Sequence, residues 1–110
     1  MAAVLSVAAD EDGGPLVVTE YGPVRGTWST GGVAAFYKVP YAGATGGAQR
    51  WRPARAPEPW TVPVNGTAPD AGACLQMNPF STPGLANAAL TLGTEDCLFS
   101  IIYSPRLPSE

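Results

Sequence analysis

Short runs of β-branched and aromatic residues, separated by turns that contain glycine and proline, dominate the first forty positions. Such runs are typical of β-strands. They cover residues 16–19, 24–28 and 33–39. Tyr21-Gly22-Pro23 has the composition of a turn and Thr30-Gly31-Gly32 that of a hairpin, because glycine tolerates the positive φ of a tight turn. The pattern predicts a three-stranded antiparallel meander over residues 16–39.

The pattern changes after Pro40, where prolines and small residues interrupt the apolar runs. Proline fixes φ and has no N–H to donate, so residues 41–73 are predicted to be mainly irregular, with a short bridge at residues 60–62. Trp28, Trp51 and Trp60 could form a set that stacks on a sugar or another ligand, but their spacing favours core or inter-domain packing. An irregular segment with such large side chains needs another surface to lie against, which is the first indication of a larger structure.

Two elements are predicted in the last third of the chain. Alanines and leucines between Gly84 and Leu92 are compatible with two helical turns, since Pro83 is acceptable at a helix start. Residues 97–104 have the composition of a strand with apolar side chains on both faces. That arrangement is typical of a strand buried inside an α/β sheet. Pro105 ends this strand.

Composition indicates a loop-rich piece with an incomplete core. The chain has 110 residues, with 13 Gly and 12 Pro. Leu, Ile, Val and Phe make up about a fifth of it, near the lower limit for a packed core. Three Trp and four Tyr nevertheless argue against a disordered chain. Residues 1–14 combine an apolar start without basic residues and an acidic, glycine-rich stretch, so we expect a flexible N-terminus there and no typical signal peptide.

Charge and cysteine content exclude several classes of function. The net charge is −3 and the basic residues are scattered, so no nucleic-acid partner is predicted. No apolar run has the length of a membrane span. There is no histidine, and the spacing of Cys74 and Cys97 fits no metal site. The two cysteines are compatible with one disulfide in a secreted chain or two free thiols in the cytosol.

Asn65-Gly66-Thr67 is an N-glycosylation sequon, which has meaning only in the secretory pathway. Chance occurrence is the alternative, because such tripeptides are common. The localisation is therefore unknown, and the sequon and the cysteine pair favour secretion only weakly.

Three stretches carry a resemblance to a known family. The first is YGPVRG (residues 21–26), which resembles an opening hairpin of that family. The second is FYKVPYA (36–42) followed by RWRP (50–53) and PEPW (57–60), similar to the pattern F-x-G-I-P-Y-A, then R-F-x-P, then a tryptophan. The third is EDCLFSIIYSP (95–105), similar to E-D-C-L-Y-L-N-V-Y-x-P. With these motifs in order, the chain resembles the type-B carboxylesterase and cholinesterase family of α/β-hydrolases.

The resemblance implies a fold class, namely the N-terminal fragment of an α/β-hydrolase. We expect mostly β-strands and irregular loops, arranged as an antiparallel meander plus the first strand of the large sheet. The domain boundaries that follow are a flexible N-terminus over residues 1–14 and a partial carboxylesterase type-B domain over residues 15–110. One departure from the family pattern lies at Ala44-Thr45, where a double proline is common, and it predicts a looser loop.

The resemblance also implies roles for individual residues. Cys74 and Cys97 are expected to form a disulfide that closes a surface loop. Arg50 and Glu95 are expected to form a salt bridge at the neck of that loop, with the neighbouring Asp96 as a competitor for the arginine. Such a pair is strong when buried and weak when exposed. Phe80, inside the loop, is a candidate for lining a substrate gorge, and a loop aromatic packed on its own base is the alternative.

Catalysis is not expected from this chain alone. Ester hydrolysis by this family's route needs a serine nucleophile, a histidine base, an acid and an oxyanion hole. The sequence contains neither the G-x-S-x-G motif nor any histidine, so no catalytic residue is assigned. The prediction is a catalytically incomplete N-terminal scaffold segment of a carboxylic-ester hydrolase, without a cofactor. Its partner would be the missing C-terminal part of the hydrolase, and an ester would be bound only by the intact protein.

Two other readings stay open at this stage. One is a non-catalytic binding or structural module derived from the hydrolase scaffold. The other is a small secreted disulfide protein unrelated to hydrolases.

Overall fold

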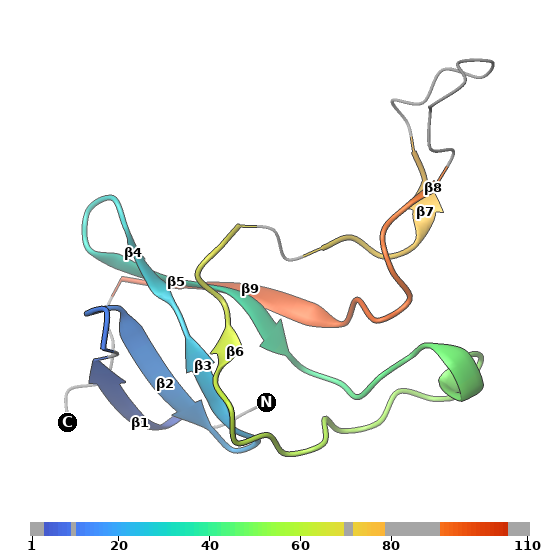
Figure 1. The fold of residues 1–110 in the computed structure, drawn as a ribbon, viewed down its shortest axis with the longest axis horizontal. Helices are drawn as coiled ribbons and strands as arrows, with labels where there is room; N and C mark the ends of the chain where they lie inside the picture. The colour runs from blue at the N-terminus through green and yellow to red at the C-terminus, as the bar shows by residue number, and fades with distance from the viewer. Residues whose placement is uncertain (1–3, 10, 70–71, 79–90, 106–110) are drawn as a thin grey trace.

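The computed structural model contains three small β-sheets and one short 3₁₀ helix within the residues it describes, 4–9, 11–69, 72–78 and 91–105 (Figure 1). The elements are β1 (Val4–Ala9), β2 (Pro15–Thr19), β3 (Pro23–Arg25), β4 (Thr27–Ser29), β5 (Val33–Pro40), η1 (Gly47–Gln49), β6 (Val64–Asn65), β7 (Gln76–Met77), β8 (Thr91–Leu92) and β9 (Phe99–Ser104). Sheet A has the strand order β1-β2-β3-β6, sheet B the order β4-β5-β9, and β7 and β8 form a third sheet.

The predicted meander is present, but its middle run is divided between the two larger sheets. β3 pairs antiparallel with β2 in sheet A, whereas β4 pairs antiparallel with β5 in sheet B. The division falls at Gly26, whose N–H donates to the Pro15 carbonyl at 2.8 Å. A Cβ at Gly26 would lie 2.7 Å from both the Ala35 carbonyl and the Phe36 ring. Only glycine therefore allows the chain to cross this closely from one sheet to the other.

A strand lies within residues 1–14, for which the sequence predicted a flexible N-terminus. Val4–Ala9 forms β1, which pairs antiparallel with β2 and aligns Val7 with Val17. Val7 also packs against the core. The physical reason is that the outer edge of β2 presents unpaired backbone groups, and an adjacent apolar segment can satisfy them.

The core lies between sheets A and B. It consists of Val17, Val24, Ala34, Phe36 and Val39, with Val7, Trp60 and Val64 packed against it. Trp60 brings the irregular segment back to sheet A, since its backbone N–H donates to the Tyr21 carbonyl and its indole N–H to the Pro23 carbonyl, both at 2.8 Å. The bridge predicted at residues 60–62 forms slightly later, where β6 pairs parallel with β3.

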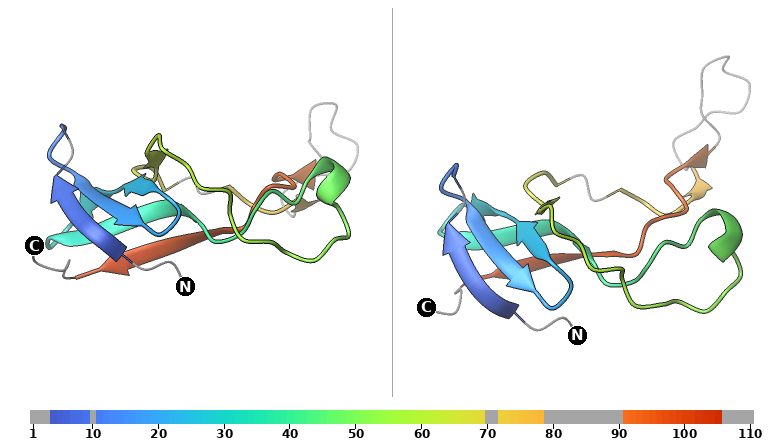
Figure 2. Two further views of the ribbon diagram at one scale, coloured as in Figure 1. Left: turned by 90° about the horizontal axis from the view of Figure 1, so that it is seen from below. Right: turned by 60° about the horizontal axis from the view of Figure 1, so that its bottom comes forward.

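β9 is covered on one edge only. It pairs antiparallel with β5, with Phe36 opposite Ile102, and Tyr37 meets Tyr103 edge to face at 5.8 Å. Among the described strands, none pairs with the other edge of β9, which lies at the rim of sheet B (Figure 2). The strand predicted at residues 97–104 is therefore present as β9 but is not buried within this chain, since Ile101, Ile102 and Tyr103 are 49%, 45% and 58% exposed.

The molecule is more extended than a compact domain of its size. Its radius of gyration is 16.6 Å, against about 13 Å expected for a compact chain of this length. Part of the extension comes from an arm built on β7 and β8, which projects away from sheets A and B (Figures 1 and 2). The helical turns predicted between Gly84 and Leu92 fall largely outside the described residues, and Thr91 and Leu92 form β8 instead. Within the described part, no helix is long and apolar enough to cross a membrane.

Candidate functional site

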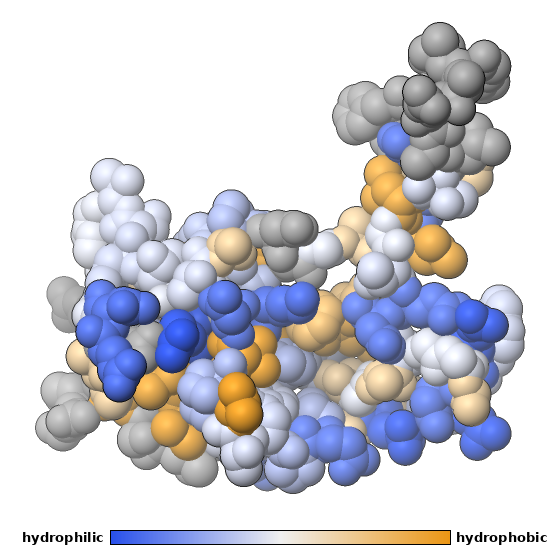
Figure 3. All heavy atoms as spheres, in the orientation of Figure 1, coloured by the Kyte–Doolittle hydropathy of each residue, from blue (hydrophilic) through white to orange (hydrophobic). Residues whose placement is uncertain are grey.

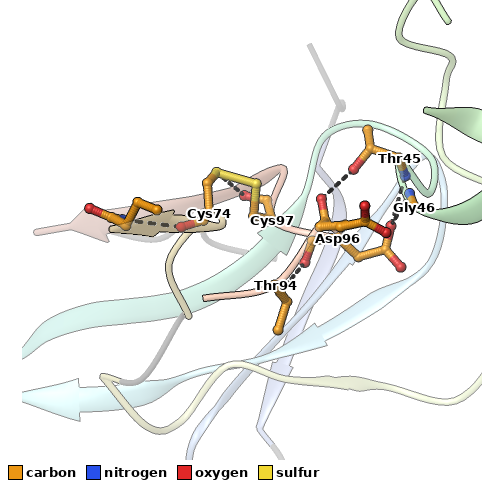
Figure 4. Close-up of a disulfide and its surroundings, with 8 residues drawn as sticks. Thr45, Gly46, Cys74, Thr94, Asp96 and Cys97 are labelled. Atoms are coloured by element: carbon orange, nitrogen blue, oxygen red, sulfur yellow. Dashed lines mark hydrogen bonds between the residues drawn. A yellow bond between two sulfur atoms is a disulfide. The ribbon is translucent and has the colours of Figure 1, made fainter. Parts of the chain in front are cut away.

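The candidate site is a neck at the base of the arm, where residues 45–50 meet Cys74 and residues 94–97. A disulfide joins Cys74 to Cys97, with their Cα atoms 5.0 Å apart (Figure 4). This separation lies within the usual range for disulfides. The bond closes the two ends of the arm covalently, so the disulfide implied by the family resemblance is present.

Arg50 and Glu95 form the second connection of the neck. The guanidinium donates from Nε to Glu95 Oε1 and from Nη2 to Glu95 Oε2, the latter at 2.9 Å. Hydrogen bonding to Arg50, and more weakly to the Gly47 N–H, holds the pKa of the Glu95 carboxyl below its usual range. The same bond to Glu95 raises the pKa of Arg50. Because the two side chains are 57% and 34% exposed, the pair orients the segments more than it stabilises them.

Asp96 has a role that the sequence analysis missed. It does not compete for Arg50. Its Oδ1 instead accepts the backbone N–H groups of Thr45 at 2.7 Å and Gly46 at 3.0 Å (Figure 4). The Thr45 hydroxyl in turn donates to the Glu95 carbonyl at 2.6 Å. Both adjacent carboxylates thus hold this loop. Asp96 accepts two backbone N–H groups, and Glu95 binds Arg50 and accepts the Gly47 N–H.

Thr45, at the place of the family's double proline, holds its loop through two hydrogen bonds. The expectation of a looser loop at Ala44-Thr45 overlooked that threonine supplies a backbone N–H and a hydroxyl, whereas proline has neither. Both groups are used to hold the loop to residues 95 and 96. The sequence does contain both partners, a threonine in a glycine-rich loop and the acidic pair Glu95-Asp96 before Cys97. Because they lie about fifty positions apart, the local pattern does not show that they meet.

The base of the arm is closed by backbone contacts beside the disulfide. Thr94 donates to the Ala73 carbonyl at 2.9 Å and accepts from the Leu75 N–H at 3.0 Å. Gly93 precedes this pairing with a φ of 93°, and a Cβ there would collide with the backbone of residues 73 and 74. Glycine is therefore required at the point where the returning strand enters the neck.

The remaining predicted site residues lie apart from the neck or outside the described residues. Asn65 is exposed at the end of β6, and its Oδ1 accepts the Thr67 hydroxyl at 2.8 Å and the Thr67 N–H at 3.2 Å. Phe80 lies outside the described residues, so its gorge-lining role stays a prediction. Trp51 is fully exposed beside the neck with a φ of 62°, so it does not pack in the core of this chain, and its inter-domain packing stays a prediction.

The chemistry available at the neck is structural. Its carboxylates are engaged by Arg50 and by backbone N–H groups, and its sulfurs are joined to each other. The described residues contain no group of three His, Cys, Asp or Glu side chains placed to hold a metal ion. The neck therefore fixes the position of a loop and an arm relative to the sheets.

Comparison with known proteins agrees with this architecture. The model of the carboxylesterase family matches residues 13–110. Juvenile hormone esterase of Tribolium castaneum is 38% identical over 97 residues, which cover 84% of this chain and 15% of the relative. Para-nitrobenzyl esterase of Bacillus subtilis is 33% identical over 95 residues, which cover 86% of this chain and 19% of the relative. The solved structure of a thermophilic PNB esterase superposes with a TM-score of 0.64 at 30% identity, covering 86% of this chain and 19% of that one.

These matches define the class of protein first, an α/β-hydrolase of the esterase type, and confirm the predicted fold class. The chain belongs to the carboxylesterase family. It spans 15% to 19% of the length of these relatives.

Replacing both cysteines, as Cys74→Ser with Cys97→Ser, is predicted to lower the free energy of unfolding by about 3 kcal/mol. Without the bond between these residues, which are 23 positions apart, the unfolded chain regains conformational entropy. Guanidinium unfolding followed by tryptophan fluorescence measures this. Wild-type protein kept in a reducing agent is the matched control and should unfold with the double variant. Equal stability of the oxidised and reduced wild-type protein would contradict the prediction.

Glu95→Gln is predicted to lower stability at pH 7 by a small amount, and this difference from wild type is predicted to shrink as the pH falls below the ordinary carboxyl pKa. The pKa of Glu95 is lowered in the folded state, so its contribution is complete above the ordinary carboxyl pKa and is lost as the pH falls through the lowered value. Urea midpoints of wild type and variant between pH 2 and pH 7 measure the difference. Glu58→Gln, an exposed carboxyl with no ion pair among the described residues, is the control and should give parallel curves. A Glu95→Gln curve parallel to wild type would disprove the coupling.

Proposed function

We propose that this chain is the N-terminal scaffold segment of a carboxylic-ester hydrolase and contributes no catalytic group. The observation that carries the proposal is the family match over residues 13–110 in a sequence that contains no histidine. The neck supports it, because its disulfide, its ion pair and the Asp96 carboxylate each connect segments distant in the sequence.

The reaction class explains why this segment needs a partner. Hydrolysis through a serine requires a base that takes the serine proton, and histidine is that base in the Ser-His-acid triad. A nucleophile on a G-x-S-x-G elbow and donors for the oxyanion are also required. The proposed partner is the remaining part of an esterase domain, and the proposed substrate, a carboxylic ester, would be bound only by the complete assembly. No cofactor enters this chemistry.

The purified chain is predicted to hydrolyse p-nitrophenyl acetate no faster than buffer. Absorbance of released p-nitrophenolate measures this, with a complete para-nitrobenzyl esterase as the active control. Hydrolysis above the buffer rate that is blocked by an organophosphate reagent for active serines would contradict the proposal, because such a reagent reports an activated nucleophile.

Asn65 is proposed as a glycan acceptor when the chain passes through a secretory pathway. Its side chain is exposed, and the Thr67 hydroxyl already contacts it at 2.8 Å. The intervening Gly66 is pinned, because its N–H donates to the Arg25 carbonyl and its carbonyl accepts from the Tyr37 N–H. This leaves the asparagine at a fixed and accessible position.

Secretion from eukaryotic cells is predicted to give a product heavier than the sequence mass of 11.3 kDa, with the excess removed by an N-glycosidase. Asn65→Gln and Thr67→Ala should abolish the excess. Thr67→Ser, which keeps the hydroxyl and the sequon, is the control and should retain it. An unmodified wild-type product from such cells refutes the assignment.

A further inference from the structure

Asn65 is followed by Gly66, and this pair has a reactivity that is separate from glycosylation. An asparagine before glycine can close a five-membered ring, because the next backbone nitrogen reaches the side-chain carbon Cγ and glycine has no Cβ to shield it. The sequence contains two further asparagines, Asn78 before proline and Asn87 before alanine. Proline has no N–H to deprotonate and the alanine Cβ hinders the attack, so Asn65 is the most reactive asparagine of the unfolded chain.

The fold requires glycine at position 66. Gly66 is buried between the two larger sheets, where its N–H donates to the Arg25 carbonyl at 2.9 Å and its carbonyl accepts the Tyr37 N–H at 3.0 Å. A Cβ at this position would lie 2.8 Å from the Arg25 carbonyl oxygen and 3.2 Å from the Tyr37 nitrogen. The close approach of the sheets thus places the least hindered backbone nitrogen directly after an asparagine.

The electrophilic half of the reaction is prepared in the folded chain. Asn65 Oδ1 accepts the Thr67 hydroxyl at 2.8 Å and the Thr67 N–H at 3.2 Å. These bonds hold the side chain back along the Gly66 peptide, as in an Asx turn. Two donors on Oδ1 also stabilise the negative oxygen that forms when a nucleophile attacks Cγ. The side-chain amide of Asn65 is therefore activated, and the residue is exposed to water.

The nucleophilic half is withheld by the pairing of β6 with β3. The Gly66 nitrogen attacks only after it loses its proton, and its hydrogen bond to the Arg25 carbonyl keeps that proton in place. Ring closure also needs a rotation of the Asn65 backbone, which the parallel pairing of Val64 with Val24 and of Asn65 with Arg25 prevents. β6 has two residues and lies at the edge of sheet A, so it is an element that opens without unfolding of the whole chain.

We propose that Asn65 is a deamidation site controlled by the pairing of β6 with β3. When β6 opens, the Gly66 nitrogen bonds to Asn65 Cγ, its proton passes to Nδ2, and the Cγ–Nδ2 bond breaks to release ammonia. Water then opens the resulting succinimide at either of its two carbonyl carbons and leaves aspartate or isoaspartate at position 65. Both products carry a new negative charge and neither accepts a glycan, so deamidation and glycosylation exclude each other here. This inference is independent of the proposed esterase function.

The test follows deamidation of the full, unglycosylated chain at neutral pH and body temperature, with peptide mapping by mass spectrometry. We expect aspartate and isoaspartate at position 65 to form at least about tenfold more slowly in the folded chain than in guanidinium, because only the open fraction reacts. Asn78 is the internal control and should stay unmodified in both conditions. Equal rates in the folded and denatured chain overturn the proposal, and so does an Asn65 that stays intact in the denatured chain.

Val64→Ala tests the role of the pairing without changing the Asn-Gly pair. Val64 packs against the core and pairs with Val24, so its truncation should favour the open form of β6. Deamidation of the folded variant should be at least about fivefold faster, with the rate in guanidinium unchanged. Val62→Ala is the matched control, since Val62 is 77% exposed, and it should change neither rate. Acceleration by both variants equally, or by neither, contradicts the proposal.

Hydrogen exchange of the wild-type chain keeps the inference testable if Val64→Ala does not fold. The Gly66 N–H must leave the Arg25 carbonyl before it either exchanges or is lost to ring closure. The exchange rate of this amide and the deamidation rate should therefore rise in the same proportion as guanidinium is added below the unfolding transition. Deamidation that accelerates while the Gly66 amide stays protected, or stays constant while that amide exchanges faster, overturns the proposal.

Discussion

The close approach of the Phe36 ring to the bare backbone of Gly26 is the contact on which the sheets depend. A Cβ at Gly26 would lie 2.7 Å from that ring, so the two sheets are joined at a distance that no other residue permits. The crossing lets one continuous run serve both sheets, as β3 on one side and β4 on the other. It also places Phe36 in the core and aligns β5 for pairing with β9. Among the described strands, sheet B ends at β9, so one edge of that strand has no partner.

Different interactions fix the two ends of the long irregular segment. At one end, Trp60 combines burial with two hydrogen bonds to sheet A. At the other, the neck uses a disulfide, a paired carboxylate and Asp96 on two backbone N–H groups. The neck is mostly exposed, so solvent weakens its electrostatic contacts. They orient the chain segments and add little to the free energy of unfolding. The covalent bond supplies the constraint that the exposed polar contacts lack.

Local patterns predicted the local elements, and family motifs predicted two contacts over long range. The strands at 16–19 and 33–39 follow from β-branched runs, and the pairings of Cys74 with Cys97 and Arg50 with Glu95, implied by the resemblance, are both present. What could not be predicted depends on partners distant in sequence. β1 is a strand only because β2 offers an edge, Asp96 has its role only because Thr45 lies beside it, and neither partner is visible in the pattern of the segment itself.

Trp51 has a strained backbone conformation beside the neck. A tryptophan with a φ of 62° is in a conformation that bulky residues avoid, and it persists only where neighbouring contacts determine it. Those contacts are present, because Arg50 is tied to Glu95 and the Arg52 N–H donates to the Gln49 carbonyl at 3.2 Å. The result is a fully exposed indole, and hydrophobic surface also lies along the arm (Figure 3). The hydrogen bonds of the neck therefore hold a tryptophan in a backbone conformation that its own side chain disfavours.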